Sequence, residues 1–379
     1  MEHELLKSHP AVFAVEDEYQ IMVCVKHPCL MWVQVGEERF YDESNGILRS
    51  NVTTHRMKIP AEILNHAKAY TLCWRKIIER KPYRTETEDE QRLTYSFRPV
   101  QGEKTVLYHI ADAHNMVDAP VAAARYFEAK YGKLDALILN GDIPNHSGEI
   151  AYFDHIYEII SRLTEGQIPT VFSRGNHDMR GFYAENIAEY TPNHHGNTFY
   201  TFRIGDIRGV ILDCGEDKAD SNEEYGNTVC CHQFRKRQTR WLRQTAQEKA
   251  FNAPDVKHKI VLCHIPFPLH QPAERFDIEK EIYGEWCSVL KTEIRPDLMI
   301  SGHLHKQFVS FPGDERDDYL GNPCPIAVCS LPRRGKPEEG TTDYHAGAGF
   351  LFEPNQITCI PVDSEGTFFE TTVFPKNKK

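Results

Sequence analysis

The sequence of 379 residues lacks three features that would place it on a membrane or on nucleic acid. No apolar run approaches the ~20 residues that a transmembrane helix needs, and residues 1–6 are acidic without the apolar core of a signal peptide. Basic tracts are scarce: only residues 235–237 stand out, and the net charge is −11. We therefore expect a cytoplasmic protein with no membrane span and no general nucleic-acid binding.

The cysteines cannot all be paired in disulfides within the chain, because their number, eleven, is odd. Many cysteines lie inside apolar runs, namely Cys24, Cys73, Cys214, Cys263, Cys329 and Cys359. We interpret them as reduced core thiols. None falls at the metal-ligand positions argued below, which disfavours a structural zinc site built from four cysteines.

The length exceeds what one compact core usually serves, so we expect two domains. Up to about residue 100, short runs such as 19–25, 31–35 and 69–74 alternate apolar and polar residues between turn signals. This spacing predicts a small all-β sandwich of immunoglobulin or fibronectin III-like kind over residues 1–100. From residue 101 to residue 379, strand-like runs alternate with helical stretches, which predicts an α/β domain with parallel strands covered by helices.

Polar clusters follow five apolar runs of this second part. In chain order they are Asp112-Ala113-His114, Gly141-Asp142-Ile143-Pro144-Asn145, Gly175-Asn176-His177-Asp178, His264, and Gly302-His303-Leu304-His305. Ligands bind at the carboxyl ends of the strands in an open α/β sheet, so we expect the five clusters to meet at one site.

These clusters contain the donors that a pair of divalent cations needs. The candidate ligands are Asp112, His114, Asp142, Asn176, His264, His303 and His305. Carboxylate, amide and imidazole donors suit Mn²⁺, Fe²⁺ and Zn²⁺ alike, and two cations about 3.5–4 Å apart need a shared anionic ligand. The Asp-x-His and His-x-His spacings place both side chains of a pair on one side of an extended backbone. Glycines at positions 141, 175 and 302 allow tight turns beside the ligands.

The five clusters, which span residues 104–310, resemble the sequence blocks of the calcineurin-like metallophosphoesterase superfamily. The resemblance implies a four-layer αββα sandwich. It also implies one metal held by Asp112, His114, Asp142 and His305, and a second held by Asp142, Asn176, His264 and His303, so that Asp142 bridges. By the same analogy His177 faces the substrate, and Asp178 orients it.

A sandwich in front of such a domain is similar to the arrangement in purple acid phosphatases. His114 stands where that group has a glycine, and Asn145 stands where it has its metal-binding tyrosine. We therefore expect a similar phosphoesterase without the coloured iron(III) centre.

The expected reaction is hydrolysis of a small phosphate ester. Two cations lower the pKa of a bridging water, whose hydroxide then attacks phosphorus, while His177 protonates the leaving oxygen or stabilises charge in the transition state. Arg180 and His146 are the candidate substrate-binding residues: Arg180 carries forked donors that suit a phosphate, and His146 follows Asn145. A surface salt bridge is nearly as good an explanation for Arg180.

Two other functions use the same residues. A nuclease or cyclic-nucleotide phosphodiesterase would need the same metals, although a nuclease predicts a basic groove that the net charge of −11 disfavours. A scaffold that binds metal without turnover is the other alternative, and the complete ligand set together with His177 favours an enzyme over it. Monoester and diester substrates both remain open at this stage.

Overall fold

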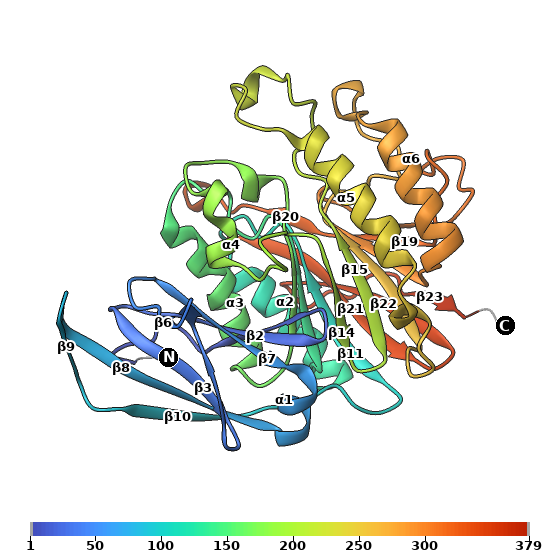
Figure 1. Cartoon of the computed structure of the whole chain (residues 1–379). Coiled ribbons are helices and arrows are strands. Elements are labelled where there is room, and N and C mark those ends of the chain that lie inside the picture. Colours follow the sequence, from blue (N-terminus) through green and yellow to red (C-terminus); the bar gives the residue numbers. More distant parts are fainter. Residues whose placement is uncertain (1–2, 377–379) are drawn as a thin grey trace.

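The computed structural model describes residues 3–376, and two large sheets form its centre (Figure 1). The first has ten strands within the described residues. In spatial order they are β23 (Thr372–Pro375), β22 (Gln356–Asp363), β21 (Tyr344–Glu353), β11 (Thr105–Ile110), β12 (Ala136–Asn140), β13 (Thr170–Ser173), β1 (Ala11–Val15), β2 (Glu18–Cys24) and β7 (Thr54–Pro60), with β20 (Leu331–Arg333) paired to β21. Strands β11, β12, β13 and β1 are parallel to one another.

The second sheet has six strands in the described part of the chain. Their order is β14 (Tyr200–Ile204), β15 (Ile207–Leu212), β16 (His258–Cys263), β17 (Leu298–Ser301), β19 (Ile326–Cys329) and β18 (Gln307–Ser310). Alternate residues of β16 face opposite sides, because side chains alternate along a strand. Ile260 and Leu262 join the core between the two sheets, whereas Val261 and Cys263 join a second core under the outer helices.

Helices cover the outer face of each large sheet. The covering helices are α2 (Asp118–Tyr131), α3 (Asp154–Thr164), α5 (Cys231–Ala246) and α6 (Lys280–Val289), the last continued by a π-turn over Leu290–Ile294. The shorter helices α1 (Ala61–Ala67) and α4 (Ile187–Tyr190) lie elsewhere, and α1 contacts β2 and β7. Short 3₁₀ turns occupy Ile150–Phe153, His177–Met179, Ala184–Asn186, Glu223–Tyr225, Lys249–Asn252, Glu274–Phe276 and Pro337–Glu339.

The order of layers is helices, sheet, sheet, helices. Helices α2 and α3 contact the first sheet, and α5 and α6 contribute Leu242 and Trp286 to the core outside the second sheet. Helix α3 shows why its sequence folds this way, because Ile156, Ile159 and Ile160 recur at helical spacing and are all buried. No helix in the described range has both the length and the apolar character to cross a membrane.

The predicted separate sandwich over residues 1–100 is not confirmed. Strand β1 pairs in parallel with β13 at Phe13 and Thr170, and β2 and β7 follow it, so the N-terminal segment extends the first large sheet. The physical reason is that all five residues of β1 are apolar and buried, which suits an inner strand covered on both faces. A division of the chain near residue 100 stays a prediction.

The other N-terminal strands form a small sheet beside the large one, where β3, β8, β9 and β10 are labelled in Figure 1. Its strands are β10 (Gln91–Ser96), β8 (Ala69–Lys81), β3 (Cys29–Val35) and β4 (Glu38–Tyr41), with β9 (Arg84–Thr87) paired to β8. A two-stranded piece joins β5 (Glu43–Ser44) to β6 (Ile47–Leu48). All eleven cysteines of the chain are free thiols, and only Cys230 is exposed, as the interpretation of core thiols required.

Candidate metal centre

The five polar clusters lie at the ends of five strands, as the sequence predicted. Strands β11, β12 and β13 of the first sheet end just before Asp112, Asp142 and Asn176, and strands β16 and β17 of the second sheet end just before His264 and His303. Contacts between these side chains across the two sheets bring the clusters together. The site is therefore built where the two sheets meet at their carboxyl ends.

Asp112 is the centre of one group of donors. Its Oδ1 lies 3.3 Å from His305 Nε2, 3.7 Å from His264 Nε2 and 3.9 Å from His114 Nε2. The Nε2 atoms of His114 and His305 are 3.2 Å apart. The ligand atoms of Asp112, His114 and His305 all lie within 4.8 Å of one another, close enough to share one cation.

Asp142 is the centre of the other group. Its Oδ2 lies 3.2 Å from His264 Nε2 and 4.0 Å from His177 Nε2. Asn176 Oδ1 and His303 Nδ1 approach each other to 3.0 Å on the same side of the site. Asp142 shares one set of close donor atoms with Asp112 and His264, and another with His114 and His177.

Backbone N–H groups fix one oxygen of each aspartate and leave the other free. The N–H of His303 donates to Asp112 Oδ2 at 2.8 Å, and the N–H of His177 donates to Asp142 Oδ1 at 2.9 Å. The second oxygens, Asp112 Oδ1 and Asp142 Oδ2, face the histidines. This arrangement orients both carboxylates before any ligand binds.

Two buried atoms at the centre test whether the residues fit a metal, because neither makes a hydrogen bond of good geometry. The polar neighbours of Asp112 Oδ1 and His264 Nε2 are other candidate ligands: His305 Nε2 lies 3.3 Å from the first, and Asp142 Oδ2 lies 3.2 Å from the second. A buried polar atom without a partner costs free energy, and a carboxylate oxygen and an imidazole nitrogen are donors that divalent cations accept. The donor set therefore fits divalent cations, with no cysteine among it.

The backbone is strained at most of the candidate ligands. The φ angles are +54° at Asp112, +45° at His114, +53° at Asp142, +66° at His303 and +50° at His305. Each such residue costs about 1–3 kcal/mol and persists only where the surrounding structure enforces it, and strain of this kind gathers at ligand-binding sites. The strain indicates that the positions of these side chains are selected for function at some expense of stability.

The three glycines of the clusters let the backbone pass close to the candidate ligands, as their positions in the sequence predicted. A Cβ at Gly175 would lie 2.2 Å from Asp142 Oδ1, and one at Gly302 would lie 2.6 Å from Asp112 Oδ2. At Gly141, whose φ is +82°, a Cβ would lie 2.6 Å from His264 Nδ1.

The electrostatics prepare the donors for a cation. Burial opposes ionisation of Asp142, but the neighbouring His264 holds the pKa of this carboxyl below its ordinary value. Burial likewise opposes the charge on His264, yet Asp142 and Asp112 raise its pKa to about 10. Burial lowers the pKa of His114 and of His303 to about 4, so both are neutral at pH 7 with a lone pair to offer. A cation bound here would take the place of the proton on His264.

Sequence reasoning missed the residues that support the ligands from behind. His264 Nδ1 lies 2.7 Å from the carbonyl oxygen of Asn140, which fixes the ring and directs Nε2 into the site. The amide of Asn140 contacts His109 Nε2 at 3.1 Å, and His345 Nε2 lies 2.8 Å from the carbonyl oxygen of Ala111. The available signal was a histidine or asparagine near one end of an otherwise apolar strand.

His177 lies at the edge of the metal cluster and is partly exposed. Its Nδ1 is 2.9 Å from the carbonyl oxygen of Asn145, and its Nε2 is 3.2 Å from Arg180 Nη1. Because a carbonyl oxygen can only accept, Nδ1 carries the proton, and Nε2 accepts from Arg180. Its ring centroid lies 4.8 Å from that of His114.

Asp178 does not orient the His177 ring, in contrast to the expectation from the resemblance. Asp178 is fully buried, and its Oδ2 accepts the backbone N–H groups of Gly175 at 2.7 Å and Asp142 at 3.2 Å. A buried carboxylate needs N–H donors, and the tight turn supplies them from the backbone. Burial and the charge of Asp142 raise the pKa of Asp178 to about 7. The carboxylate fixes the turn that carries the ligands, and Asn145 orients the imidazole.

The two candidate substrate-binding residues have different surroundings. Arg180 Nε and Nη2 each donate to the Glu216 carboxylate at 2.9 Å, and Nη1 contacts His177. His146 Nδ1 accepts the N–H of Gly148 at 3.0 Å, and its ring packs against Tyr152. The structure therefore places Arg180 next to the site and ties His146 to its own loop.

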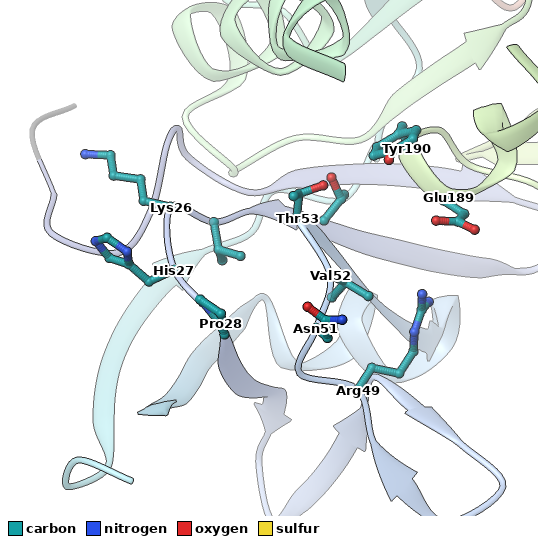
Figure 2. A pocket seen from close by; sticks show the side chains of 11 residues that line it. Lys26, His27, Pro28, Arg49, Asn51, Val52, Thr53, Glu189 and Tyr190 are labelled. Carbon is teal, nitrogen blue, oxygen red and sulfur yellow. The ribbon is translucent and has the colours of Figure 1, made fainter. Parts of the chain in front are cut away.

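A separate pocket of about 260 Å³ lies away from these strand ends. Lys26 and His27 lie on one side of it, and Arg49 and Glu189 lie on the other (Figure 2). In the part of the chain that the structure describes, the groups of potential metal ligands all lie at the strand ends instead. This pocket is therefore distinct from the candidate metal centre.

Comparisons with known proteins agree with this geometry. A family model described as calcineurin-like phosphoesterase matches residues 105–307, which is more than half of the chain. A serine/threonine-protein phosphatase of Danio rerio, CPPED1, is 24% identical over 148 residues, which is 38% of this chain and 44% of that protein, so the match spans less than half of this relative. The solved structure of the purple acid phosphatase PPD1 from yellow lupin (Lupinus luteus) seeds has a similar fold, with a TM-score of 0.58 and 12% identity over 98% of this chain and 74% of that chain. The chain belongs to the calcineurin-like phosphoesterase family.

Proposed function

We propose that this protein is a metal-dependent phosphoric ester hydrolase that acts on a small phosphate ester. The observation that carries the proposal is the close approach of carboxylate and imidazole donors around buried Asp112 Oδ1 and His264 Nε2, at the meeting point of five strand ends. Family membership supports the same activity. A cytoplasmic location is part of the proposal.

Two cations would share the seven candidate ligands. Asp112, His114, Asp142 and His305 would hold the first, and Asp142, Asn176, His264 and His303 would hold the second. The position of Asp142 Oδ2, 3.2 Å from His264 Nε2, supports its place between the two. When bound, the cations supply positive charge to the phosphoryl oxygens and lower the pKa of a coordinated water.

Arg180 supports binding of the phosphoryl group. Glu216 holds the guanidinium through Nε and Nη2, so Nη1 is the donor directed toward His177. A phosphoryl oxygen is a charged acceptor and forms a stronger hydrogen bond than a neutral imidazole nitrogen. We therefore expect Nη1 to turn from His177 Nε2 to the substrate when the ester binds.

His177 supports departure of the leaving group. Its ring is oriented by Asn145 through Nδ1, and its Nε2 becomes free to hold a proton once Arg180 binds the phosphoryl group. Nε2 can then take up a proton from solvent and pass it to the leaving oxygen, which is a general-acid contribution of about 10²–10⁴-fold. Asp178 contributes indirectly, because it holds the backbone of Gly175 and Asp142 in place.

Metal replacement combined with a substrate panel tests the proposal. Metal-free protein is restored with Mn²⁺, Fe²⁺ or Zn²⁺ and assayed with p-nitrophenyl phosphate and bis-p-nitrophenyl phosphate. We expect hydrolysis to return as two equivalents of one of these metals bind, and the ratio of the two rates gives the preference for monoester or diester. Protein that holds two metals and hydrolyses neither ester would refute the proposal in favour of a metal-binding scaffold.

A further inference from the structure

A cleft of about 640 Å³ opens beside the catalytic edge of the metal centre. Its lining includes Met179, Arg180, Phe182, Tyr225 and Val229. Arg180 connects the cleft to the site, because it lines the cleft while its Nη1 lies 3.2 Å from His177 Nε2. A group attached to a phosphoryl oxygen on the His177 side would therefore extend into this cleft.

Phe182 is the apolar residue of the cleft that faces water. Its side chain is 80% exposed. A single exposed aromatic is common on protein surfaces and carries no meaning by itself. Phe182 differs from such cases by its place in a cleft beside His177 and by the rigidity of its backbone.

The backbone on both sides of Phe182 is anchored. The N–H of Ser147 donates to the carbonyl oxygen of Arg180 at 2.6 Å, and the N–H of Tyr183 donates to the carbonyl oxygen of Ser147 at 2.9 Å. Gly181 lies so close to the next segment that a Cβ there would be 2.4 Å from the backbone nitrogen of Gly148. The aromatic ring is therefore presented by a fixed turn, and little backbone freedom is lost when a ligand contacts it.

The charges of the cleft show which ligands it disfavours. The charged residues that line it are Arg174, Arg180, Glu185, Glu216 and Glu224. Arg174 is 2.7 Å from buried Asp213, Arg180 is held by buried Glu216, and Glu224 is 2.9 Å from Lys218. Glu185 has no ion pair among the residues that the structure describes, which leaves the cleft with excess negative charge. A leaving group with a second anionic charge would be repelled.

We propose that this cleft receives the leaving group of the ester and that Phe182 selects a flat, apolar leaving group without further negative charge. The substrate class is therefore a phosphomonoester of an aromatic or similarly flat alcohol, in preference to nucleoside polyphosphates and other polyanions. The inference rests on the proposed function, because the phosphoryl group at the metal centre places the leaving group beside His177. Phe182 then stacks on that group from the rigid turn.

Kinetics with two esters of equal charge test this role. Metal-restored parent, Phe182→Ala and Phe182→Trp are compared on 2-naphthyl phosphate and ethyl phosphate. We expect Phe182→Ala to lower kcat/KM for the naphthyl ester about tenfold, mainly through KM, and to change the ethyl ester less than about twofold. Phe182→Trp should keep the parent preference. The matched control is Tyr83→Ala, an exposed aromatic in the turn between β8 and β9, which should change neither ester.

Binding of non-hydrolysable analogues separates this inference from the proposed function. Calorimetry with 2-naphthyl phosphonate and ethyl phosphonate should show a preference for the naphthyl compound that Phe182→Ala removes. Equal losses for both compounds, no loss for either, or no preference in the parent would overturn the role of Phe182. Parent protein that prefers the naphthyl phosphonate and hydrolyses no ester would support the cleft and refute the hydrolase.

Discussion

Glu216 binds Arg180 through two parallel hydrogen bonds of 2.9 Å and thereby fixes a guanidinium beside His177. The Glu216 carboxylate is 1% exposed and also accepts the hydroxyl of Tyr225 at 3.1 Å. A buried carboxylate that loses its cation is strongly destabilised. The pair is therefore both a structural element of the loop and the means by which one N–H of Arg180 reaches the site.

Arg180→Lys should weaken substrate binding while metal content is kept. Lysine retains the charge but lacks the fork that engages Glu216 and His177 together. Because hydrogen bonds to charged groups contribute about 1.5–3 kcal/mol, we expect KM for p-nitrophenyl phosphate to rise about tenfold or more. The control is Arg316→Lys, since Arg316 is an exposed arginine paired with Asp317. Equal KM values for parent and Arg180→Lys would remove Arg180 from the binding site.

His177→Ala should keep both metals and lose most turnover. His177 Nε2 lies 4.0 Å from Asp142 Oδ2, but His177 Nδ1 is held by the carbonyl oxygen of Asn145, and seven other side chains are proposed to hold both cations. We expect kcat to fall by about 10²–10⁴-fold. Metal analysis and steady-state kinetics measure the two effects separately, with exposed His27→Ala as control. Loss of one metal equivalent would instead make His177 a ligand.

Asp142→Asn should cost the protein both metals. The substitution removes the negative charge that the two cations are proposed to share and leaves the hydrogen bond to the His177 N–H in place. Metal analysis after dialysis should show less than half of the parent content, and added Mn²⁺ should no longer raise the thermal midpoint. Asp255→Asn, at an exposed ion pair with Arg203, is the control. Full metal stoichiometry in Asp142→Asn would contradict the bridging role.

The stability of the fold should fall in mild acid partly because of His258. This residue is buried in β16, and burial lowers its pKa to about 4, below the ordinary value of 6.5. Between these values the unfolded chain binds a proton that the folded chain does not, so the free energy of unfolding decreases as the pH falls from 6.5 toward 4. One such group contributes up to about 1.4 kcal/mol per pH unit.

Urea unfolding at pH 7 and pH 5 measures this contribution. His258→Phe keeps a ring that can pack against Phe352 and should show a smaller loss of stability between the two pH values than the parent. His66→Gln, at an exposed position of α1, should show the same loss as the parent. An identical pH dependence in His258→Phe and the parent would contradict the assignment.

The meeting of the candidate ligands could be predicted from sequence because each polar cluster follows a short apolar run, whereas their role as ligands stays a prediction. Parallel strands place such positions at one edge without any knowledge of their neighbours in the sheet. Strand β1 shows the limit of local patterns: its run Ala11–Val15 reads as a strand, but its parallel partner β13 lies more than 150 residues away. The signal for an inner strand was that every residue of β1 is apolar. The alternation of apolar and polar residues expected for a sandwich did not apply to this strand.

The finer contacts of the site could not be predicted for a related reason. Spacing places Asp178 next to His177, but it does not tell whether the carboxylate meets the imidazole or the backbone, and burial selects the backbone N–H groups. Arg180 and Glu216 are 36 residues apart, and only the fold pairs them. Interactions of this kind depend on packing that no local pattern records.

Gly175→Ala should destabilise the protein and remove bound metal, whereas Gly284→Ala should stabilise the protein. A Cβ at Gly175 would lie 2.2 Å from Asp142 Oδ1 and 2.5 Å from its backbone nitrogen, so the ligand must move. We expect a loss of about 1–3 kcal/mol in the free energy of unfolding, together with loss of bound metal. Gly284 lies inside α6, and a Cβ there would meet no neighbouring segment of the described chain within 4 Å, so alanine should add about 0.5–1 kcal/mol. Urea unfolding and metal analysis of both variants check the pair, and a Gly175→Ala protein with parent stability and metal content would show that the close approach of the two turns is not required.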